Sequence, residues 1–433
     1  MNVTAGQGVS DISQHPSNAA EETTPVALES RILSLDFIRG LAVMGILAAN
    51  IVAFGQPPSA YIWPSAFLVD PADPDGWLWI AQFVLVDGKM RGLFTLLFGA
   101  GMYLFMERAW ARGSTRWLQI WRLVLLLGFG LFHFYFIWFG DILAMYAMIG
   151  FLAVAFMRFE PGLQMRLGLL GYALGCIFLG GVFTFQYLIM ETDFGTTQAM
   201  AETRAEIAVG LETTQADEAK LTPYMHSGDY AGLLAERWKQ QWFFPFVNPI
   251  FFIFETLPLM LMGMALYRMG FFSGAFDPSE MKKWGWIGVA IGALVFLILG
   301  LFVQHEGFSY DGANAAFIGW SMLPRLMMVL GLAALLVEYS KTATGWLAQR
   351  VSATGRAAFT NYLGTSIVMM FVFHGWGLGL YGELNRPTLY LVMVLTWALM
   401  LAWSKPWLDH FRYGPMEWLW RCMTYRKLFP IRK

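Results

Sequence analysis

"WGWIGVAIGALVFLILGLFVQ", residues 284–304, contains no charged side chain. As an α-helix it is long enough to cross the roughly 30 Å of hydrocarbon in a bilayer, which takes about 20 residues. Similar apolar runs recur along nearly all of the 433 residues, and the chain is 57% hydrophobic and only 14% charged. Soluble domains carry about 25% charged residues. The sequence therefore predicts an all-α, polytopic helical membrane protein, and it lacks the strand alternation of an outer-membrane barrel.

The apolar runs predict about ten membrane-spanning helices. They are expected near residues 35–55, 89–107, 117–138, 141–158, 166–190, 246–268, 284–304, 317–339, 355–374 and 388–404. Links rich in Lys and Arg alternate along the chain with acidic or neutral links. Because basic links stay on the cytoplasmic side of a membrane, both termini are expected to be cytoplasmic.

Three regions follow from this pattern. Residues 1–30 are polar, without the features of a signal peptide, and are expected to form a disordered cytoplasmic tail. Residues 31–404 are expected to form the membrane bundle, with an acidic extracytoplasmic insert at 191–241 that holds one or two surface helices. Residues 405–433 are expected to be a cytoplasmic amphipathic segment, with "GPMEWLWR" (414–421) as a surface helix.

The segment "GWLWIAQFVLV", residues 76–86, is apolar but too short to span. It is expected to lie on the outer surface or to re-enter partway, with Trp77 and Trp79 at headgroup level. The alternative is one long tilted helix over residues 77–106. That helix would place three charged side chains at mid-membrane: Asp87, Lys89 and Arg91.

Several chemistries find no support in the sequence. Cys176 and Cys422 are far apart, and no pair of histidines has metal-ligand spacing. There is no phosphate loop or dinucleotide fingerprint, and a net charge of −1 gives no indication of nucleic-acid binding. We expect no metal and no tightly bound cofactor.

The stretch "LFHFYFIWFGDIL", residues 131–143, holds His133 and Asp141 in apolar surroundings. In the predicted topology both lie toward the outer side, at a similar depth to Asn50, Glu255 and His374 from other spans. Polar groups in lipid are costly and usually face an interior cavity. Each residue alone also has a simpler explanation: a carbonyl partner for the imidazole, a helix N-cap for the aspartate, contact between helices for the asparagine, or solvation for His374.

Three basic residues break the charge rule by lying in the outer half: Lys89, Arg91 and Arg325. Either they pair with buried carboxylates, for which Glu255 and Asp141 are candidates, or they bind an anionic ligand. Arginine suits the planar, bidentate recognition of phosphate and carboxylate groups.

Two spans share a further pattern. Asp36 and Arg39 are one helical turn apart, which is suited to an ion pair. Arg39 and Asn50 are eleven residues apart and share a helix face, about 16 Å apart. Arg122 and His133 have the same spacing, although Arg122 alone is also explained as an anchor at the inner surface. This geometry suits a passage from a cytoplasmic anionic donor to an outer reaction site.

Several stretches together resemble the YeiB-type family of bacterial membrane proteins, named for a domain of unknown function. They are "RILSLDFIRGLAVMGILAAN" (31–50), "GKMRGLFTLLFGAGM" (88–102), "HFYFIWFGDILAMYA" (133–147), "GRAAFTNYLGTSIVMMFVFHGWGLGLYG" (355–382) and "GPMEWLWRCMTY" (414–425). The resemblance covers about residues 31–425 and is weakest in the insert. It implies a multi-pass protein of the bacterial cytoplasmic (inner) membrane.

The family is similar to a broader group of integral-membrane sugar acyltransferases, which pass an acyl group from cytoplasmic acyl-CoA to a glycan on the other side. In that group the first span carries an Arg, followed after ten intervening residues by a His or an Asn. Arg39 and Asn50 match these two positions. Where the Asn version occurs, the group has a catalytic His in the following loop. Here Tyr61 stands there instead, so His133 either takes over the base role or the acyl chemistry has been lost.

Two functions are therefore expected as alternatives. In an acyltransferase, His133 would be the general base, Asp141 would orient it, and Asn50 would polarise the thioester carbonyl. Acyl-CoA would be the co-substrate, the acceptor would be an extracytoplasmic glycan, lipid or small molecule, and the oligomeric state is open. The expected substrate-binding residues are Lys89, Arg91, Arg39, Asp36, Glu255, Arg325 and His374.

In a proton-coupled transporter or lipid-handling protein, His133, Glu255 and Asp141 would relay protons. Three basic residues would then hold an anionic substrate: Lys89, Arg91 and Arg325. Against this alternative, the sequence shows no paired broken helices in two matching halves. A non-catalytic sensor or assembly factor is the third option.

Overall fold

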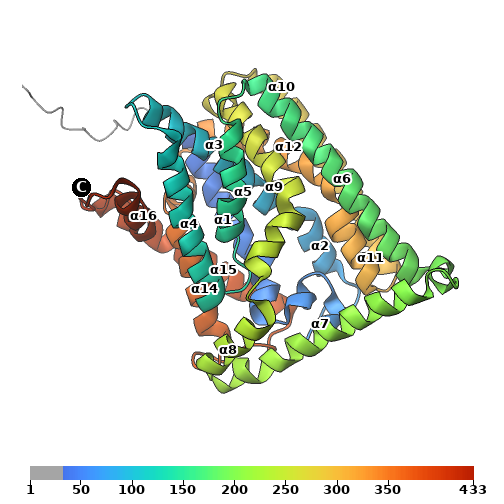
Figure 1. Ribbon diagram of the computed structural model, residues 1–433. Coiled ribbons are helices and arrows are strands. Elements are labelled where there is room, and N and C mark those ends of the chain that lie inside the picture. Colours follow the sequence, from blue (N-terminus) through green and yellow to red (C-terminus); the bar gives the residue numbers. More distant parts are fainter. Residues whose placement is uncertain (1–32) are drawn as a thin grey trace, which may run out of the picture. The chain divides into compact units, whose positions relative to one another are not determined.

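The computed structural model describes residues 33–433, and almost all of its regular structure is helical (Figure 1). Within these residues the only extended pairing is an isolated bridge between Phe411 and Arg432. The all-α class is therefore confirmed. The predicted tail at residues 1–30 lies outside the described residues.

Each of the ten predicted spans coincides with a helix. These helices are α1 (Leu33–Gly55), α3 (Lys89–Trp110), α4 (Arg116–Phe136), α5 (Leu143–Phe156), α6 (Pro161–Glu191), α9 (Phe244–Arg268), α10 (Pro278–His305), α12 (Met322–Thr342), α14 (Ala358–Phe373) and α15 (Arg386–His410). Over residues 33–433, seven helices are long and apolar enough to cross a membrane: α1, α4, α6, α9, α10, α12 and α15. The chain is thus a polytopic helical membrane protein. The count of ten spans and the orientation of the termini remain predictions.

Helix α1 is the most enclosed of these seven helices. In its most apolar stretch 72% of the residues are buried, compared with 22% in α6, α10 and α15. The latter helices carry large exposed apolar side chains, such as Ile177, Leu294 and Leu395. We infer that α1 lies at the centre of the bundle and that α6, α10 and α15 face lipid.

Helices α3 and α9 cross at two glycines. A Cβ atom on Gly99 would lie 2.1 Å from the Met260 carbonyl oxygen, and one on Gly263 would lie 2.0 Å from the Leu96 carbonyl oxygen. Only glycine permits this approach, as is common where membrane helices pack closely. The crossing matters for the site because α3 and α9 each contribute a charged residue to it.

The segment before α3 forms a separate helix, α2 (Trp77–Leu85), which ends before Gly88 turns the chain with a φ of 75°. The short helix is confirmed, and the single long helix over 77–106 is wrong. A Cβ on Gly88 would also lie 2.4 Å from Nε of Arg325. Trp79 is buried against Phe83 and Phe308. The predicted headgroup level of Trp77 and Trp79 stays a prediction.

The segment before α12 is also irregular. Helix α11 (Tyr310–Asn314) continues into a π-helical turn, η6 (Ala315–Trp320), and α12 begins only at Met322. The predicted span at 317–339 therefore starts with a π-helix, a feature often found at functional sites. The irregular backbone leaves the Phe317 carbonyl oxygen available to accept a side-chain hydrogen bond.

The insert forms α7 (Ala201–Ser227) and α8 (Tyr230–Gln241), as expected, and α7 lies across one end of the bundle (Figure 1). We call this the insert end. Glu218 of α7 accepts hydrogen bonds from the backbone N–H and the hydroxyl of Ser59, at 3.0 and 2.6 Å. Burial raises the pKa of the Glu218 carboxyl. The insert is thus tied to the loop that follows α1.

Helix α13 (Trp346–Arg356) packs against the first half of α1, away from the loop that the insert contacts. Helix α16 (Pro415–Tyr425) packs against the start of α14, directly after α13, and we call this the basic end. The predicted helix at 414–421 corresponds to α16. Its Glu417 accepts hydrogen bonds from the backbone N–H groups of Phe359 and Thr360, at 2.7 and 3.2 Å, which caps the start of α14. Burial raises the pKa of the Glu417 carboxyl.

Candidate functional site

A cavity of about 470 Å³ lies inside the bundle. Its lining comes from α1, α3, α6, α9, α12 and the turn between α4 and α5, and most of it is apolar. Five of the predicted site residues line it: Asn50, Arg91, Asp141, Glu255 and Arg325. The structure therefore brings together polar residues from distant parts of the chain, as ligand sites in helical bundles require.

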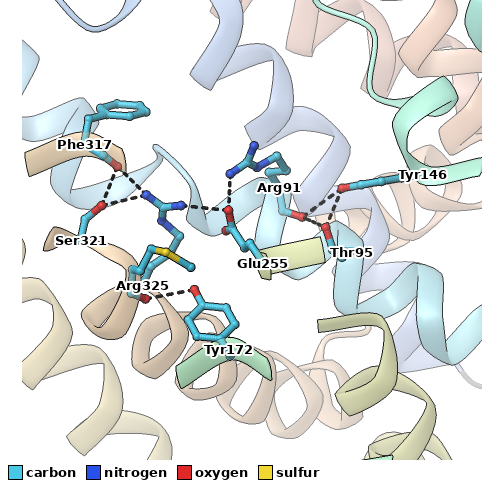
Figure 2. A network of polar contacts seen from close by, with 9 residues as sticks. Arg91, Thr95, Tyr146, Tyr172, Glu255, Phe317, Ser321 and Arg325 are labelled. Atoms are coloured by element: carbon cyan, nitrogen blue, oxygen red, sulfur yellow. Dashed lines mark hydrogen bonds and ion pairs between the residues drawn. The ribbon is translucent and has the colours of Figure 1, made fainter. Parts of the chain in front are cut away.

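Glu255 lies between two arginines on one side of this cavity (Figure 2). Its Oε2 atom is 2.5 Å from Nη2 of Arg91 and 3.1 Å from Nη1 of Arg325. The other carboxylate oxygen, Oε1, is buried and has no hydrogen-bond partner. A single carboxylate is thus the counter-ion of two guanidinium groups. The trio of Arg91, Glu255 and Arg325 carries a net charge of +1 when all three groups are ionised.

The two arginines differ in their surroundings. Arg325 is buried, and its Nη2 also donates to the Phe317 carbonyl oxygen at 2.6 Å and to the Ser321 hydroxyl at 2.8 Å. The side chain of Arg91 is 25% exposed and stacks over the Phe252 ring. Arg325 is therefore fixed by the protein on several sides, whereas Arg91 is the arginine more accessible from the cavity.

The backbone around the trio is held by hydroxyl groups. Thr95 and Tyr146 both donate to the Arg91 carbonyl oxygen, at 2.8 and 3.3 Å (Figure 2). Tyr172 donates to the Met322 carbonyl oxygen at 3.0 Å. These hydrogen bonds hold the backbones of α3 and α12 in place close to the two arginines.

A second polar chain begins at Asp141, which lines the same cavity. Nδ1 of His133 is 2.9 Å from Oδ1 of Asp141, and Nε2 of His133 is 2.9 Å from the hydroxyl of Ser366. The other oxygen of Asp141 accepts from the Ala144 backbone N–H at 2.7 Å, at the start of α5. The predicted contact between His133 and Asp141 is thus present, and so is the N-cap function that was its alternative.

His133 does not itself line the cavity. It is 0% exposed, lies behind Asp141, and its second nitrogen faces Ser366. A base that acts directly on an acceptor in the cavity would need a clear path from Nε2, and Ser366 occupies that direction. The predicted direct contact between His133 and an acceptor is therefore absent from this conformation.

Asn50 separates two spaces. It lines the large cavity and also a small void of about 10 Å³, whose other lining residues include Ser366 and Tyr362. Its Nδ2 donates to the Ile46 carbonyl oxygen one turn earlier in α1, at 2.8 Å. This hydrogen bond holds the side chain against its own helix.

Lys89 is not part of this site. The side chain is fully buried, its Nζ donates to the Phe83 carbonyl oxygen at 2.5 Å, and it lies over the Phe296 ring. Successive helix positions are about 100° apart, so Lys89 and Arg91 point about 200° apart around α3. The prediction that Lys89 contacts a ligand beside Arg91 therefore does not fit the structure.

Three other predicted residues also lie away from the cavity lining. Asp36 and Arg39 form an ion pair of 3.2 Å toward the basic end, where the Arg39 side chain is 28% exposed. His374 follows α14 and packs against Tyr230 and Trp376. Burial, together with the nearby Arg237 guanidinium, lowers the pKa of His374 to about 4.

The sequence analysis did not identify Ser366 or Asn248. Asn248 lines the cavity from α9, and Ser366 reaches His133 from α14. A serine inside an apolar span, one turn after Tyr362, is a weak signal because serines commonly bond their own helix. Tyr61, which stands at the position of the loop histidine, does line the cavity.

No cluster of three or more His, Cys, Asp or Glu side chains suited to a metal ion occurs among residues 33–433. The thiols of Cys176 and Cys422 are free.

Taken together, the fold and the site define a polytopic helical membrane protein with an interior cavity lined by two arginines, a glutamate and the aspartate of a histidine–aspartate pair. The chain belongs to the YeiB-type family. It is 30% identical to the uncharacterized protein YeiB of Escherichia coli over 92% of this chain and 98% of that protein. It is also 30% identical to the uncharacterized protein YxaH of Bacillus subtilis over 94% of this chain and 98% of that protein.

A family model described as a protein of unknown function (DUF418) matches residues 266–427. The matched part contains Arg325 and Ser366 but not His133 or Asp141. No significant match to a solved structure was found.

Proposed function

We propose that the protein is a membrane-bound acyltransferase of the bacterial cytoplasmic membrane. It would move an acyl group, such as acetyl, from cytoplasmic acyl-CoA to a hydroxyl or amine of an extracytoplasmic glycan, lipid or small molecule. The observation that carries the proposal is the hydrogen-bonded chain from Asp141, on the cavity wall, through His133 to Ser366, which lines the small void beside Asn50.

This chain has the properties of a proton acceptor for acyl transfer. The Asp141 carboxylate accepts from Nδ1 of His133, which leaves the lone pair on Nε2. A neutral imidazole held in this tautomer takes a proton from a hydroxyl group, a step typically worth about 10²–10⁴-fold in rate. Enclosure of the pair inside the bundle excludes water from the reaction.

The remaining cavity residues have complementary roles in this proposal. The Asn50 amide can donate a hydrogen bond to a thioester carbonyl as negative charge develops on its oxygen. Arg91, with the excess positive charge beside Glu255, would hold a phosphate or carboxylate of the acceptor. Lys89 and His374 take no part.

The donor would enter from the basic end. Arg39 lies on α1 at that end, about 16 Å along the helix from Asn50. The charge bias of the links predicts that this end is cytoplasmic, where acyl-CoA is found. An acyl chain on an extended thioester arm would therefore follow α1 toward the cavity, with Arg39 near the negatively charged part of the donor.

A specific observation also favours transport of an anion as a second candidate. Glu255 and its two arginines form a buried ion cluster with one unbonded carboxylate oxygen, inside a cavity at the centre of the bundle. An anion that replaced Glu255 on Arg91 would open this cluster, and protonation of Glu255 would assist. Ionisable groups buried in a helical bundle commonly mark the pathways of ions and protons.

Purified protein incubated with radiolabelled acetyl-CoA separates the two candidates. An acyltransferase without its acceptor should bind acetyl-CoA and hydrolyse it slowly, and His133→Ala should lose the hydrolysis. Ser404→Ala, at another buried helical serine, serves as the matched control and should behave as wild type. Absence of both binding and hydrolysis, together with anion uptake into proteoliposomes, would replace the acyltransferase with the transporter.

A further inference from the structure

The hydrogen bond between His133 and Ser366 indicates a chemical role for the serine. We propose that Ser366 is a catalytic nucleophile that carries the acyl group as an ester between donor and acceptor. This inference rests on the proposed function and adds a covalent intermediate to it.

The first support is the alignment of three groups from separate segments. Asp141 follows α4, His133 lies near the end of α4, and Ser366 lies within α14, 233 residues from His133. The two contacts of the imidazole are both 2.9 Å, and His133 has one on each ring nitrogen. A carboxylate, an imidazole and a hydroxyl linked in this order form the arrangement that activates serine in hydrolases of unrelated folds.

The second support is the direction of the hydroxyl proton. A carboxylate only accepts hydrogen bonds, so Nδ1 of His133 must be the protonated nitrogen toward Asp141. Nε2 then accepts, and Ser366 donates its proton to it. The other contact of the serine hydroxyl, to the Tyr362 carbonyl oxygen, is longer at 3.5 Å. The shorter contact therefore directs the proton to the imidazole, and a lone pair of the serine oxygen remains for attack.

The third support is the space beside the serine. Ser366 is 1% exposed and lines the void of about 10 Å³. Such a void is close to the smallest volume that holds a water molecule, roughly 10–15 Å³. Ile46 and Asn50 line both this void and the large cavity. A rotation of the Asn50 side chain away from the Ile46 carbonyl oxygen would join the two spaces and bring the Asn50 amide next to the carbonyl under attack.

The proposed reaction has two balanced halves. Oγ of Ser366 attacks the thioester carbonyl, its proton passes to Nε2 of His133, and the carbon–sulfur bond breaks as the new carbon–oxygen bond forms. The proton moves from His133 to the departing thiolate, which leaves as CoA thiol. An acceptor hydroxyl then attacks the serine ester and gives its proton to His133, and the ester bond to Ser366 breaks. His133 returns the proton to Oγ, and both residues are restored.

The competing explanation is that Ser366 only satisfies the second nitrogen of a buried imidazole. It predicts no covalent acyl-enzyme. Ser366→Ala would then perturb folding but leave a direct transfer by His133 in place. Ser366→Cys keeps a nucleophile of similar size, which is why it is the second variant of the test.

The test uses the full chain in detergent micelles with radiolabelled acetyl-CoA and no acceptor. We expect one acyl group per chain after acid quenching, on the peptide that contains Ser366, and its loss in Ser366→Ala and His133→Ala. Ser366→Cys should form a thioester that neutral hydroxylamine removes, unlike the serine ester. Ser404→Ala should be labelled as wild type.

A fluorophosphonate probe distinguishes failure of this inference from failure of the proposed function, because it reacts with an activated serine without acyl-CoA. Probe labelling of Ser366 without any reaction of acetyl-CoA would support the nucleophile and overturn the donor in the proposed function. Normal acetyl transfer to an acceptor by Ser366→Ala would overturn the nucleophile and leave the acyltransferase. Unlabelled Ser366 in both assays, in protein that still folds, would also overturn the nucleophile.

Discussion

His133 and Asp141 are joined by a 2.9 Å contact across the turn between α4 and α5, although they are eight positions apart in the chain. The last turn of α4 ends at Phe136, and the following residues fold back so that the carboxylate lies beside the imidazole. Trp138 contributes to this turn by packing between Phe54 and the imidazole ring. Asp141 therefore both fixes the ring and caps α5, and its two oxygens perform separate tasks.

The first prediction concerns this pair. His133→Ala should reduce acyl transfer by about 10²–10⁴-fold, the range for loss of a general base. Asp141→Asn should reduce it less and leave donor affinity nearly unchanged, because an amide keeps an oxygen for one of the two contacts. Turnover and acyl-CoA affinity measured on both variants provide the check. Full activity in His133→Ala would reduce the pair to a packing and capping role.

The second prediction concerns the buried carboxylate. Glu255→Gln leaves Arg91 and Arg325 without their shared counter-ion and should lower the free energy of unfolding by about 3–5 kcal/mol. Glu280→Gln removes an exposed ion pair with Lys283 and should change it by no more than about 0.5 kcal/mol. Thermal unfolding in detergent gives both values. Equal stability of the two variants would show that the cluster is not a fixed structural unit.

The third prediction separates the basic residues by their surroundings. Arg91→Gln should weaken binding of a phosphate-containing ligand more than it lowers stability, because this side chain is partly accessible. Arg325→Gln should mainly lower stability, since it breaks three contacts at once. Lys89→Gln should leave ligand affinity unchanged. A loss of affinity in the Lys89 variant at full stability would return that residue to the site.

The fourth prediction is the topology. In a background without Cys176 and Cys422, a cysteine at Thr214 in α7 and one at Thr115 before α4 are both exposed to solvent. An impermeant maleimide should label the first and not the second in intact cells, since the charge bias predicts that the insert lies outside. Permeabilised cells should label both. Labelling of Thr115→Cys alone in intact cells would reverse the orientation and move the donor entrance to the insert end.

The fifth prediction follows from the pKa of about 4 at His374. An unfolded histidine titrates near 6.5, so between these values the unfolded chain binds a proton that the folded chain does not. Stability should therefore fall as the pH drops from about 6.5 toward 4, by up to about 3 kcal/mol from this residue. His374→Gln should flatten that part of the profile of melting temperature against pH. An unchanged slope would show that other groups cause it.

Much of the architecture was determined by local pattern. Runs such as residues 284–304 contain enough consecutive apolar residues to define a span, and each predicted span coincides with a helix. The break before α3 follows from Gly88, which adopts a positive φ that other residues rarely take. The sequence also contained the reason to separate Lys89 from Arg91. Two positions apart on one helix, their side chains point to nearly opposite sides.

The site itself could be predicted only in part. The predicted depth in the membrane was enough to group Asn50, Asp141, Glu255 and Arg325. A predicted topology gives the depth of each polar residue, but it does not give the direction in which the side chain points around its helix. The same argument also included His374, which does not line the cavity and packs against Tyr230 of the insert. The burial of Trp79 depends on its packing against Phe308, which the apolar sequence of α2 does not by itself indicate.

The sequence by itself determined the helical membrane class, the position of the spans, the insert and the residues that are expensive to bury, because these depend on chain-local hydrophobicity and charge. Only the tertiary structure decided which of these residues are in contact. Arg91 and Glu255 are 164 residues apart, and His133 and Ser366 are 233 apart. Their contact depends on close crossings such as that of Gly99 and Gly263 and on the rotation of each helix about its axis, and no local pattern specifies these.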